Sequence, residues 1–261
     1  MKILLTNDDG IHADGLIQLT RFLKSQGNSV FVVAPATEQS GVSSAITYLR
    51  PLIAKPFTTL PSHPTEVEGA ILNGTPVDCV RLGLHELCPW KPDVIVSGIN
   101  DGLNAGTNVN YSGTVAGAMT GASLGFKAMA ISVESGPQQE YFRAAESAWP
   151  LIQKLAATDL PKKSFLNVNY PTQAIETKPN FDFQVVPAET NPMGYQFAHG
   201  HDPKNRPYYW ATNNPPPEPS PFLTDTQVLR QGKVTATVLS SDLNYRNTEQ
   251  LPDWLSGSEK Q

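Results

Sequence analysis

The sequence predicts an α/β fold organised around a mostly parallel β-sheet. Short apolar segments alternate with amphipathic segments through the first two thirds of the 261 residues, and polar turns follow several of the apolar segments. Alternating strands and helices favour parallel pairing through right-handed crossovers, which place the strand-to-helix turns at one edge of the sheet.

The elements can be assigned in order from hydrophobic periodicity. Short apolar runs predict strands at 2–6, 30–34, 69–72, 93–97, 128–133 and 165–168. Apolar stripes at helical spacing predict helices over 16–23, 77–87, 115–126 and 142–152. Gly27 ends the first of these helices, and Thr75-Pro76 caps the second. The proline-rich stretch 47–60 is expected to form an excursion or a hairpin rather than a core element.

Two adjacent carboxylates, Asp8 and Asp9, directly follow the first strand. Carboxylates held side by side repel each other, so a pair at a fixed strand end favours a bound hard cation. The sequence Asn7-Asp8-Asp9-Gly10 is also good turn chemistry, which leaves a purely structural role open. The loops 37–44 and 100–110 follow two other predicted strands and should meet the acids at the same edge of the sheet.

Both loops carry groups that could serve a ligand at this edge. Ser40 could offer its hydroxyl to a metal as a weak neutral ligand, or it could belong to an ordinary serine-rich surface loop. Ser112, Gly113 and Thr114 open the next helix, whose unpaired N–H groups and dipole favour an anion. The two hydroxyls could instead be simple helix caps.

The composition argues against several classes of protein. A net charge of -5 disfavours nucleic acid as the main partner, because proteins that bind polyanions usually carry a basic face. Cys79 and Cys88 lack metal-ligand spacing and are expected to be reduced packing residues of an intracellular protein. We find no signal-peptide pattern and no run of roughly twenty apolar residues, so we expect a cytoplasmic protein with no membrane partner.

Several motifs occur in an order that is specific when they are taken together. They are Asn7-Asp8-Asp9-Gly10, Val33-Ala34-Pro35 with Gln39-Ser40-Gly41, Ile46-Thr47, Asn73-Gly74-Thr75-Pro76, Ser97-Gly98-Ile99-Asn100 and Tyr111-Ser112-Gly113-Thr114-Val115. In this combination residues 1–135 resemble the SurE family of survival-protein nucleotidases. Weaker similarity continues through 206–210 and a closing strand at 234–239.

The resemblance implies a three-layer, Rossmann-like sandwich with C-terminal β-hairpin or arm extensions that serve oligomerisation. It implies a single SurE-like domain over 1–261. It also implies that the protein forms a homodimer or a homotetramer. Within this domain the core covers approximately 1–180, the arms and closing elements 181–250, and a tail 251–261.

The resemblance also implies a metal-dependent phosphomonoesterase that hydrolyses nucleoside 5′- and 3′-monophosphates. The family's motif places one divalent cation per subunit, Mg²⁺ or Mn²⁺, on the oxygens of Asp8, Asp9, Ser40 and Asn100. Attack by metal-activated water is expected, with either aspartate as a base or even a nucleophile. The candidates for binding phosphate are Asn100, Ser112, Gly113 and Thr114.

Other classes lack a residue that they require. A phosphoacceptor receiver domain needs an aspartate at a central strand end, where Pro35, Asn73 and Asn100 stand. A dinucleotide-binding oxidoreductase needs a G-x-G-x-x-G turn after the first strand, and a phosphatase of the haloacid dehalogenase type needs an acid at Gly10. A non-enzymatic nucleotide-binding protein on the same fold is the remaining alternative.

The last third of the chain has no clear period. Prolines, asparagines and aromatics crowd the stretch 191–223, including the proline-rich segment 215–221, and predict long loops or arms around short strands. The aromatic run 208–210 could line a nucleoside pocket or a subunit interface, and the family resemblance favours the interface. His199 and His201 are interpreted as polar loop residues rather than metal ligands, and Glu189 is left without a role.

Overall fold

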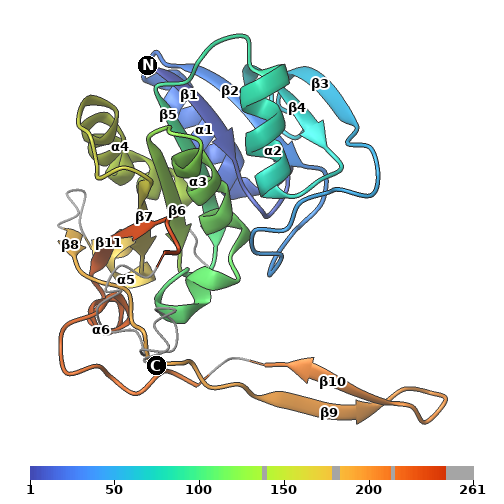
Figure 1. Cartoon of the computed structure of the whole chain (residues 1–261), viewed down its shortest axis with the longest axis vertical. Coiled ribbons are helices and arrows are strands. Elements are labelled where there is room, and N and C mark those ends of the chain that lie inside the picture. Colours follow the sequence, from blue (N-terminus) through green and yellow to red (C-terminus); the bar gives the residue numbers. More distant parts are fainter. Residues whose placement is uncertain (137–139, 178–182, 213–214, 245–261) are drawn as a thin grey trace, which may run out of the picture.

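The computed structural model describes residues 1–136, 140–177, 183–212 and 215–244. Figure 1 shows a large sheet with helices on both faces and a two-stranded hairpin that projects away from it. The nine-stranded sheet has the order β3-β4-β2-β1-β5-β6-β7-β11-β8. Its strands are β1 (Lys2–Thr6), β2 (Ser29–Pro35), β3 (Ala54–Thr59), β4 (Glu66–Leu72), β5 (Val94–Asp101), β6 (Ala128–Val133), β7 (Ser164–Tyr170), β8 (Phe183–Val185) and β11 (Val234–Ser240).

The centre of the sheet is parallel, which confirms the α/β prediction. Neighbouring strands from β4 through β2, β1, β5 and β6 to β7 pair in parallel. The edge strand β3 runs antiparallel to β4, so the stretch expected to be an excursion does form a hairpin. At the other side, the closing strand β11 is antiparallel to β7 and parallel to β8.

Two helical layers enclose the sheet and create two cores. Helices α1 (Asp14–Ser25) and α4 (Tyr141–Ala157) pack together on one face, and α2 (Pro76–Leu82) and α3 (Gly113–Ser123) pack together on the other. Successive residues of β1 serve opposite faces: Ile3 and Leu5 join the core under α1 and α4, whereas Leu4 joins the core under α2 and α3. Within the described residues, no helix is long and apolar enough to cross a membrane.

Several elements differ from the sequence-based expectation. The strand expected at 93–97 continues to Asp101, because an irregularity at Gly98, whose φ is +136°, lets pairing with β6 resume at Asn100. Asn100 therefore lies at a strand end and not in a turn. The second helix ends in a π-helical turn, η1 (Gly83–Leu87). Four elements were not predicted, namely β8, the short helices α5 (Thr172–Thr177) and α6 (Asp225–Arg230), and the 3-10 turn η2 (Gly106–Asn110) within the loop after β5.

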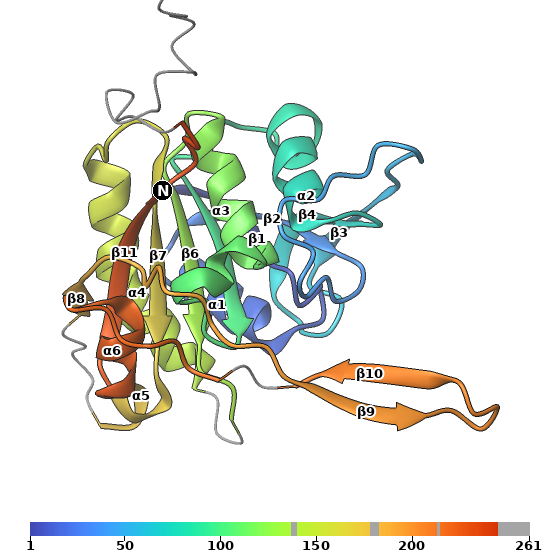
Figure 2. The same ribbon diagram turned by 60° about the horizontal axis from the view of Figure 1, so that its bottom comes forward.

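The projecting hairpin consists of β9 (Phe197–His201) and β10 (Pro207–Ala211), which pair antiparallel. Both views show it reaching away from the sheet (Figures 1 and 2). Tyr209 and Trp210 on β10 are 63% and 68% exposed. Part of the stretch 191–223 thus forms an arm around short strands, as expected, whereas the predicted tail at 251–261 lies outside the described residues.

Candidate functional site

Three loops from separate parts of the sequence meet at the carboxyl edge of the sheet. The loop after β2 is held against the acidic turn because the N–H of Gln39 donates to the carbonyl oxygen of Asp8 at 2.7 Å. The end of β5 is held there because the N–H of Asp101 donates to Oδ2 of Asp9 at 3.1 Å. Since β1 pairs in parallel with both β2 and β5, the predicted convergence of these loops is confirmed.

Asp8 lies at the centre of this meeting point and is only 4% exposed. Its Oδ1 accepts a hydrogen bond from the hydroxyl of Thr114, and the same hydroxyl oxygen lies 3.2 Å from Oδ1 of Asn100. The start of α3 packs so closely here that a Cβ at Gly113 would lie 2.8 Å from the Cβ of Asp8. The structure therefore brings Asp8, Asn100, Gly113 and Thr114 into one cluster, and glycine is required where the helix meets the acid.

The surroundings of Asp8 and Asp9 disfavour the negatively charged form of both side chains. Burial raises the pKa of Asp8, although hydrogen bonds from Thr114 and Gly113 oppose this effect. Burial and the negative charge of Asp8 raise the pKa of Asp9 to about 7, with smaller contributions from the charges of Asp101 and Glu38. Two acids with raised pKa values in an acidic environment would gain from a bound cation.

The donor atoms fit a hard divalent cation. Asp8, Asp9 and Asn100 offer carboxylate and amide oxygens, and the Asn100 amide nitrogen is already used, because Nδ2 donates to the carbonyl of Gly102 at 2.7 Å. No group of three His, Cys, Asp or Glu side chains suited to a metal occurs among the described residues. A cation at the acids would therefore also use neutral oxygens, which suits Mg²⁺ or Mn²⁺.

Ser40 and Ser112 are placed differently from the central cluster. Ser40 is exposed, and its hydroxyl donates to Oε1 of Glu38 at 2.7 Å. Its loop touches the acids through Gln39, but a metal ligand at Ser40 stays a prediction. The Ser112 hydroxyl accepts the N–H of Val115 at 3.0 Å, so this side chain caps α3, as one of the two sequence interpretations expected.

Sequence reasoning missed three side chains around the site. Tyr141, at the start of α4, is buried, and burial together with the charges of Asp101 and Asp9 raises its pKa. Its position depends on how α4 docks, and no local pattern marks it. The charges of Asp101 and Glu38 were also missed, although both lie within two residues of a predicted ligand.

A second pair of carboxylates, Glu189 and Asp225, fastens the loop after β5 to the C-terminal part of the chain. Oδ2 of Asp225 accepts the N–H of Gly106 at 2.9 Å, and Oδ1 accepts the N–H of Glu189 at 2.8 Å. Glu189 in turn accepts hydrogen bonds from the hydroxyls of Ser220 and Thr224 at 2.6 and 3.2 Å. Both acids are at most 1% exposed, with Glu189 at 1% and Asp225 at 0%. Glu189, which had no role from sequence, is thus part of a buried network.

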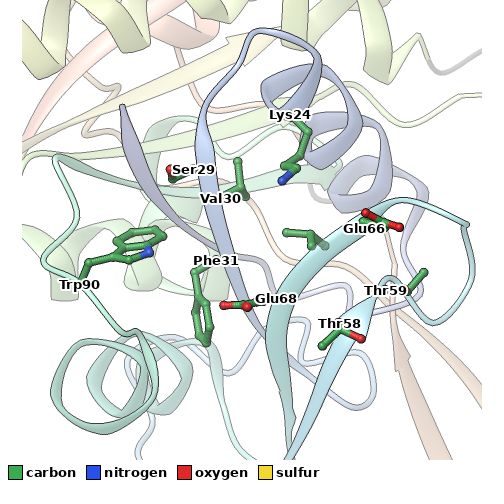
Figure 3. A pocket seen from close by; sticks show the side chains of 10 residues that line it. Lys24, Ser29, Val30, Phe31, Thr58, Thr59, Glu66, Glu68 and Trp90 are labelled. Carbon is green, nitrogen blue, oxygen red and sulfur yellow. The ribbon is translucent and has the colours of Figure 1, made fainter.

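The two histidines and a further pocket belong to parts of the structure other than the acid site. His199 and His201 belong to strand β9 of the hairpin and not to a loop, and the ring of His199 packs edge-on against Tyr209 with 5.0 Å between centroids. A pocket of 520 Å³ opens where β2 and β4 begin, at the opposite edge of the sheet. Figure 3 shows that charged and aromatic side chains surround it, with Glu68 beside its strand partner Phe31.

Comparisons with known proteins show which family the chain is similar to. The sequence model of the family described as "Survival protein SurE" matches residues 3–191. A protein of Rhodopirellula baltica named "5'-nucleotidase SurE" is 42% identical over 257 residues, covering 97% of this chain and 98% of its own length. A protein of the same name from Nitratidesulfovibrio vulgaris is 37% identical over 248 residues, covering 95% of this chain and 96% of its own.

The fold also matches a solved structure. The crystal structure of the SurE protein from Aquifex aeolicus superposes with a TM-score of 0.79 at 31% identity. The match covers 98% of this chain and 100% of the other. The similarity therefore includes the C-terminal part of the chain as well as the parallel sheet.

Proposed function

Because the chain belongs to the SurE family, we propose that it hydrolyses nucleoside 5′- and 3′-monophosphates to nucleoside and phosphate with the help of a divalent cation. The hydrolase class follows from the full-length relatives named 5'-nucleotidase. The observation that carries the metal dependence is the cluster of oxygen donors at the end of β1, where the buried Asp8 and the partly buried Asp9 lie together and the Thr114 hydroxyl bridges Asp8 and Asn100.

The cation would be held by Asp8, Asp9, Ser40 and Asn100, with the Ser40 hydroxyl released from Glu38. When bound, Mg²⁺ or Mn²⁺ polarises a phosphoryl group and lowers the pKa of a water molecule. Asp9 is the better candidate for proton transfer, because Asp8 is nearly fully buried and held by Thr114. Asp9 is only partly buried, so its carboxylate can reach a water molecule beside the cation.

The phosphate group would lie at the start of α3, next to the cation. Asn100, Ser112, Gly113 and Thr114 surround this position, and the amino end of a helix favours an anion. Since the Ser112 hydroxyl caps the helix, and since the hydroxyl of Thr114 and the N–H groups of Gly113 and Thr114 face Asp8, we assign the attraction of the phosphate to the positive end of the α3 dipole together with the cation beside it. We assign the projecting hairpin, with its exposed aromatic residues, to a homodimer or homotetramer interface.

A phosphate-release assay tests the proposal against the alternative of a non-enzymatic nucleotide binder. Nucleoside 5′- and 3′-monophosphates are offered to the purified chain with Mn²⁺, with Mg²⁺ and with EDTA. We expect turnover with the cations and its loss in EDTA, followed by recovery when Mn²⁺ is restored. Nucleotide binding without metal-dependent phosphate release would favour the binder, and turnover that resists EDTA would remove the metal from the proposal.

A further inference from the structure

A second pocket, of 250 Å³, opens at the same edge of the sheet as the acid pair. One wall is the loop after β5, with Leu103, Ala105 and Asn108. Glu134, which directly follows β6, also lines the pocket. Because β5 pairs in parallel with β1 and β6 pairs in parallel with β5, the carboxyl ends of β5 and β6 lie at the same edge of the sheet as Asp8.

The other walls come from the C-terminal part of the chain. Helix α6 contributes Thr226, Leu229 and Arg230, and the preceding segment contributes Met193 and the proline pair 216–217. The pocket lies next to the acid site across the sheet. The N–H of Asp101 donates to Asp9, Asp101 pairs with Val133 of β6, and Glu134 of the pocket lining directly follows Val133. A molecule whose phosphate lies at the start of α3 could therefore extend into this pocket.

The lining suits a flat, mostly apolar ring that carries polar atoms at its edge. Leucine, methionine and proline side chains cover most of it, while Asn108, Glu134 and Arg230 offer a few polar groups. Ligand sites of this kind are mainly apolar, with few polar groups that fix orientation. The volume of 250 Å³ lies just below the range of about 300–1,000 Å³ for drug-sized ligands, so it suits a single nucleoside and not an oligonucleotide.

The buried carboxylates hold these walls in place. Asp225 joins the backbone of Gly106 in the loop to the backbone of Glu189 in the C-terminal part. The N–H of Met193 also donates to the Thr107 hydroxyl at 3.4 Å. The pocket is thus built before a ligand arrives, which lowers the entropic cost of binding.

We infer that this pocket, between the loop after β5 and helix α6, binds the nucleobase of the substrate and gives the enzyme its preference for nucleotides over other phosphomonoesters. The inference rests on the proposed nucleotidase function and adds the site that recognises the base. Asp225 is a positioning residue in this scheme, because it holds the walls and does not line the pocket.

The test compares AMP with ribose 5-phosphate, which carries the same phosphate and sugar without a base. The wild-type chain should show a kcat/KM for AMP at least about tenfold higher than for ribose 5-phosphate, the scale of apolar pocket discrimination. Met193→Trp and Leu229→Trp, which fill the pocket from opposite walls, should remove this preference by lowering only the AMP value. Adenosine should inhibit ribose 5-phosphate hydrolysis by the wild type but not by the filled variants.

Phe222→Trp is the matched control, because Phe222 belongs to the same segment, is 52% exposed and does not line the pocket. It should retain the wild-type preference for AMP. If Leu229→Trp does not fold, Met193→Trp still tests whether the pocket binds the base, because Met193 is only half-buried. Equal wild-type activity on both substrates, or filled variants that keep the preference, would overturn the inference, whereas no turnover on either substrate would instead reject the nucleotidase function.

Discussion

Two pairs of carboxylates in this protein have different surroundings. Burial raises the pKa of Asp9 to about 7 together with the charges of the acids beside it, namely Asp8, Asp101 and Glu38. Burial acts to raise the pKa of Glu189 as well, but hydrogen bonds from Ser220, Asn191 and Thr224 outweigh it and lower the pKa to about 2. Asp9 is therefore surrounded mainly by negative charge, whereas Glu189 is surrounded by hydrogen-bond donors.

The hydrogen-bond partners of a carboxylate distinguish an acid suited to binding a cation from one that supports the fold. Asp225, the partner of Glu189, accepts backbone N–H groups from Gly106, Glu189 and Thr226. Burial still raises its pKa, but its oxygens are engaged by the chain itself. Asp9 has negatively charged neighbours and, among the described residues, accepts one hydrogen bond, from the N–H of Asp101, so we assign the first pair to the proposed chemistry and the second to architecture.

The largest effect should come from removing charge at the first pair. Asp8→Asn and Asp9→Asn should each lower kcat for AMP by more than about a hundredfold, because even substitutions behind a metal ligand cost 10–100-fold. Phosphate release in Mn²⁺ measures the loss, and circular dichroism should show a retained fold. Asp159→Asn, at a side chain that is 93% exposed, should leave activity unchanged. Unfolding of both site variants would give the pair a structural role and erase the contrast with Glu189 and Asp225.

The next effect concerns Thr114, whose hydroxyl donates to Asp8. Thr114→Val removes this donor at nearly constant volume and should weaken activity about 10–100-fold, as expected for a group that orients a metal ligand. Thr114→Ser should restore most of the activity, and added Mn²⁺ should partly rescue the valine variant. Thr120→Val is the control, because the Thr120 hydroxyl donates to Ala116 within the same helix. A loss that Mn²⁺ does not change would assign Thr114 to phosphate alone.

The fold of the core could be predicted well because its signal is local. The strands 2–6 and 128–133 agree with the structure residue for residue, since each is a short apolar run that ends in a polar turn. The irregular end of β5 could not be predicted, because it depends on pairing with β6 beyond Gly98. The short helix α6 was missed for a similar reason, as its position depends on contacts with β11 and with Gly106.

The site was predictable only where motif and topology coincide. The meeting of Asp8 with the loops after β2 and β5 follows from parallel pairing, and the structure confirms it. The metal set with Ser40 comes from the family resemblance and stays a prediction, since the Ser40 hydroxyl faces Glu38 in the structure. Glu189 and Asp225 gave no sequence signal, because their partners are mostly backbone N–H groups that any residue can supply.

A smaller effect, on stability rather than activity, is expected at the second pair. Asp225→Asn replaces one acceptor oxygen by a donor that faces backbone N–H groups, and should lower the free energy of unfolding by about 1–3 kcal/mol. Urea denaturation measures this change. Asp202→Asn on the hairpin, where the carboxylate also accepts backbone N–H groups but at the surface, should change stability less. An unaltered stability in Asp225→Asn would mean that the buried network is not what fastens the loop.

The smallest effect is a pH-dependent response of stability to metal, which only the first pair should show. In the metal-free protein the pKa of Asp9 is about 7, whereas an unfolded aspartate titrates near its ordinary value of 3.8. Between these values the folded state holds a proton that the unfolded chain has released, so this group's contribution to stability falls as the pH rises. A cation must displace that proton at pH 5 but not at pH 8, and should therefore stabilise the protein more at pH 8.

Thermal unfolding with Mn²⁺ measures the response. At pH 8, Mn²⁺ at ten times its Kd at that pH should raise the free energy of unfolding by about 1.4 kcal/mol, or Tm by about 3–6 °C. The same Mn²⁺ concentration should give a smaller gain at pH 5. Asp9→Asn should lose most of the gain at pH 8, since the buried charge that attracts the cation is gone. Asp225→Asn should start from a lower Tm and keep the full increment, because its carboxylate is engaged by the chain. An equal Mn²⁺ increment at both pH values, or one retained by Asp9→Asn, would show that the cation does not bind through the acids at the end of β1.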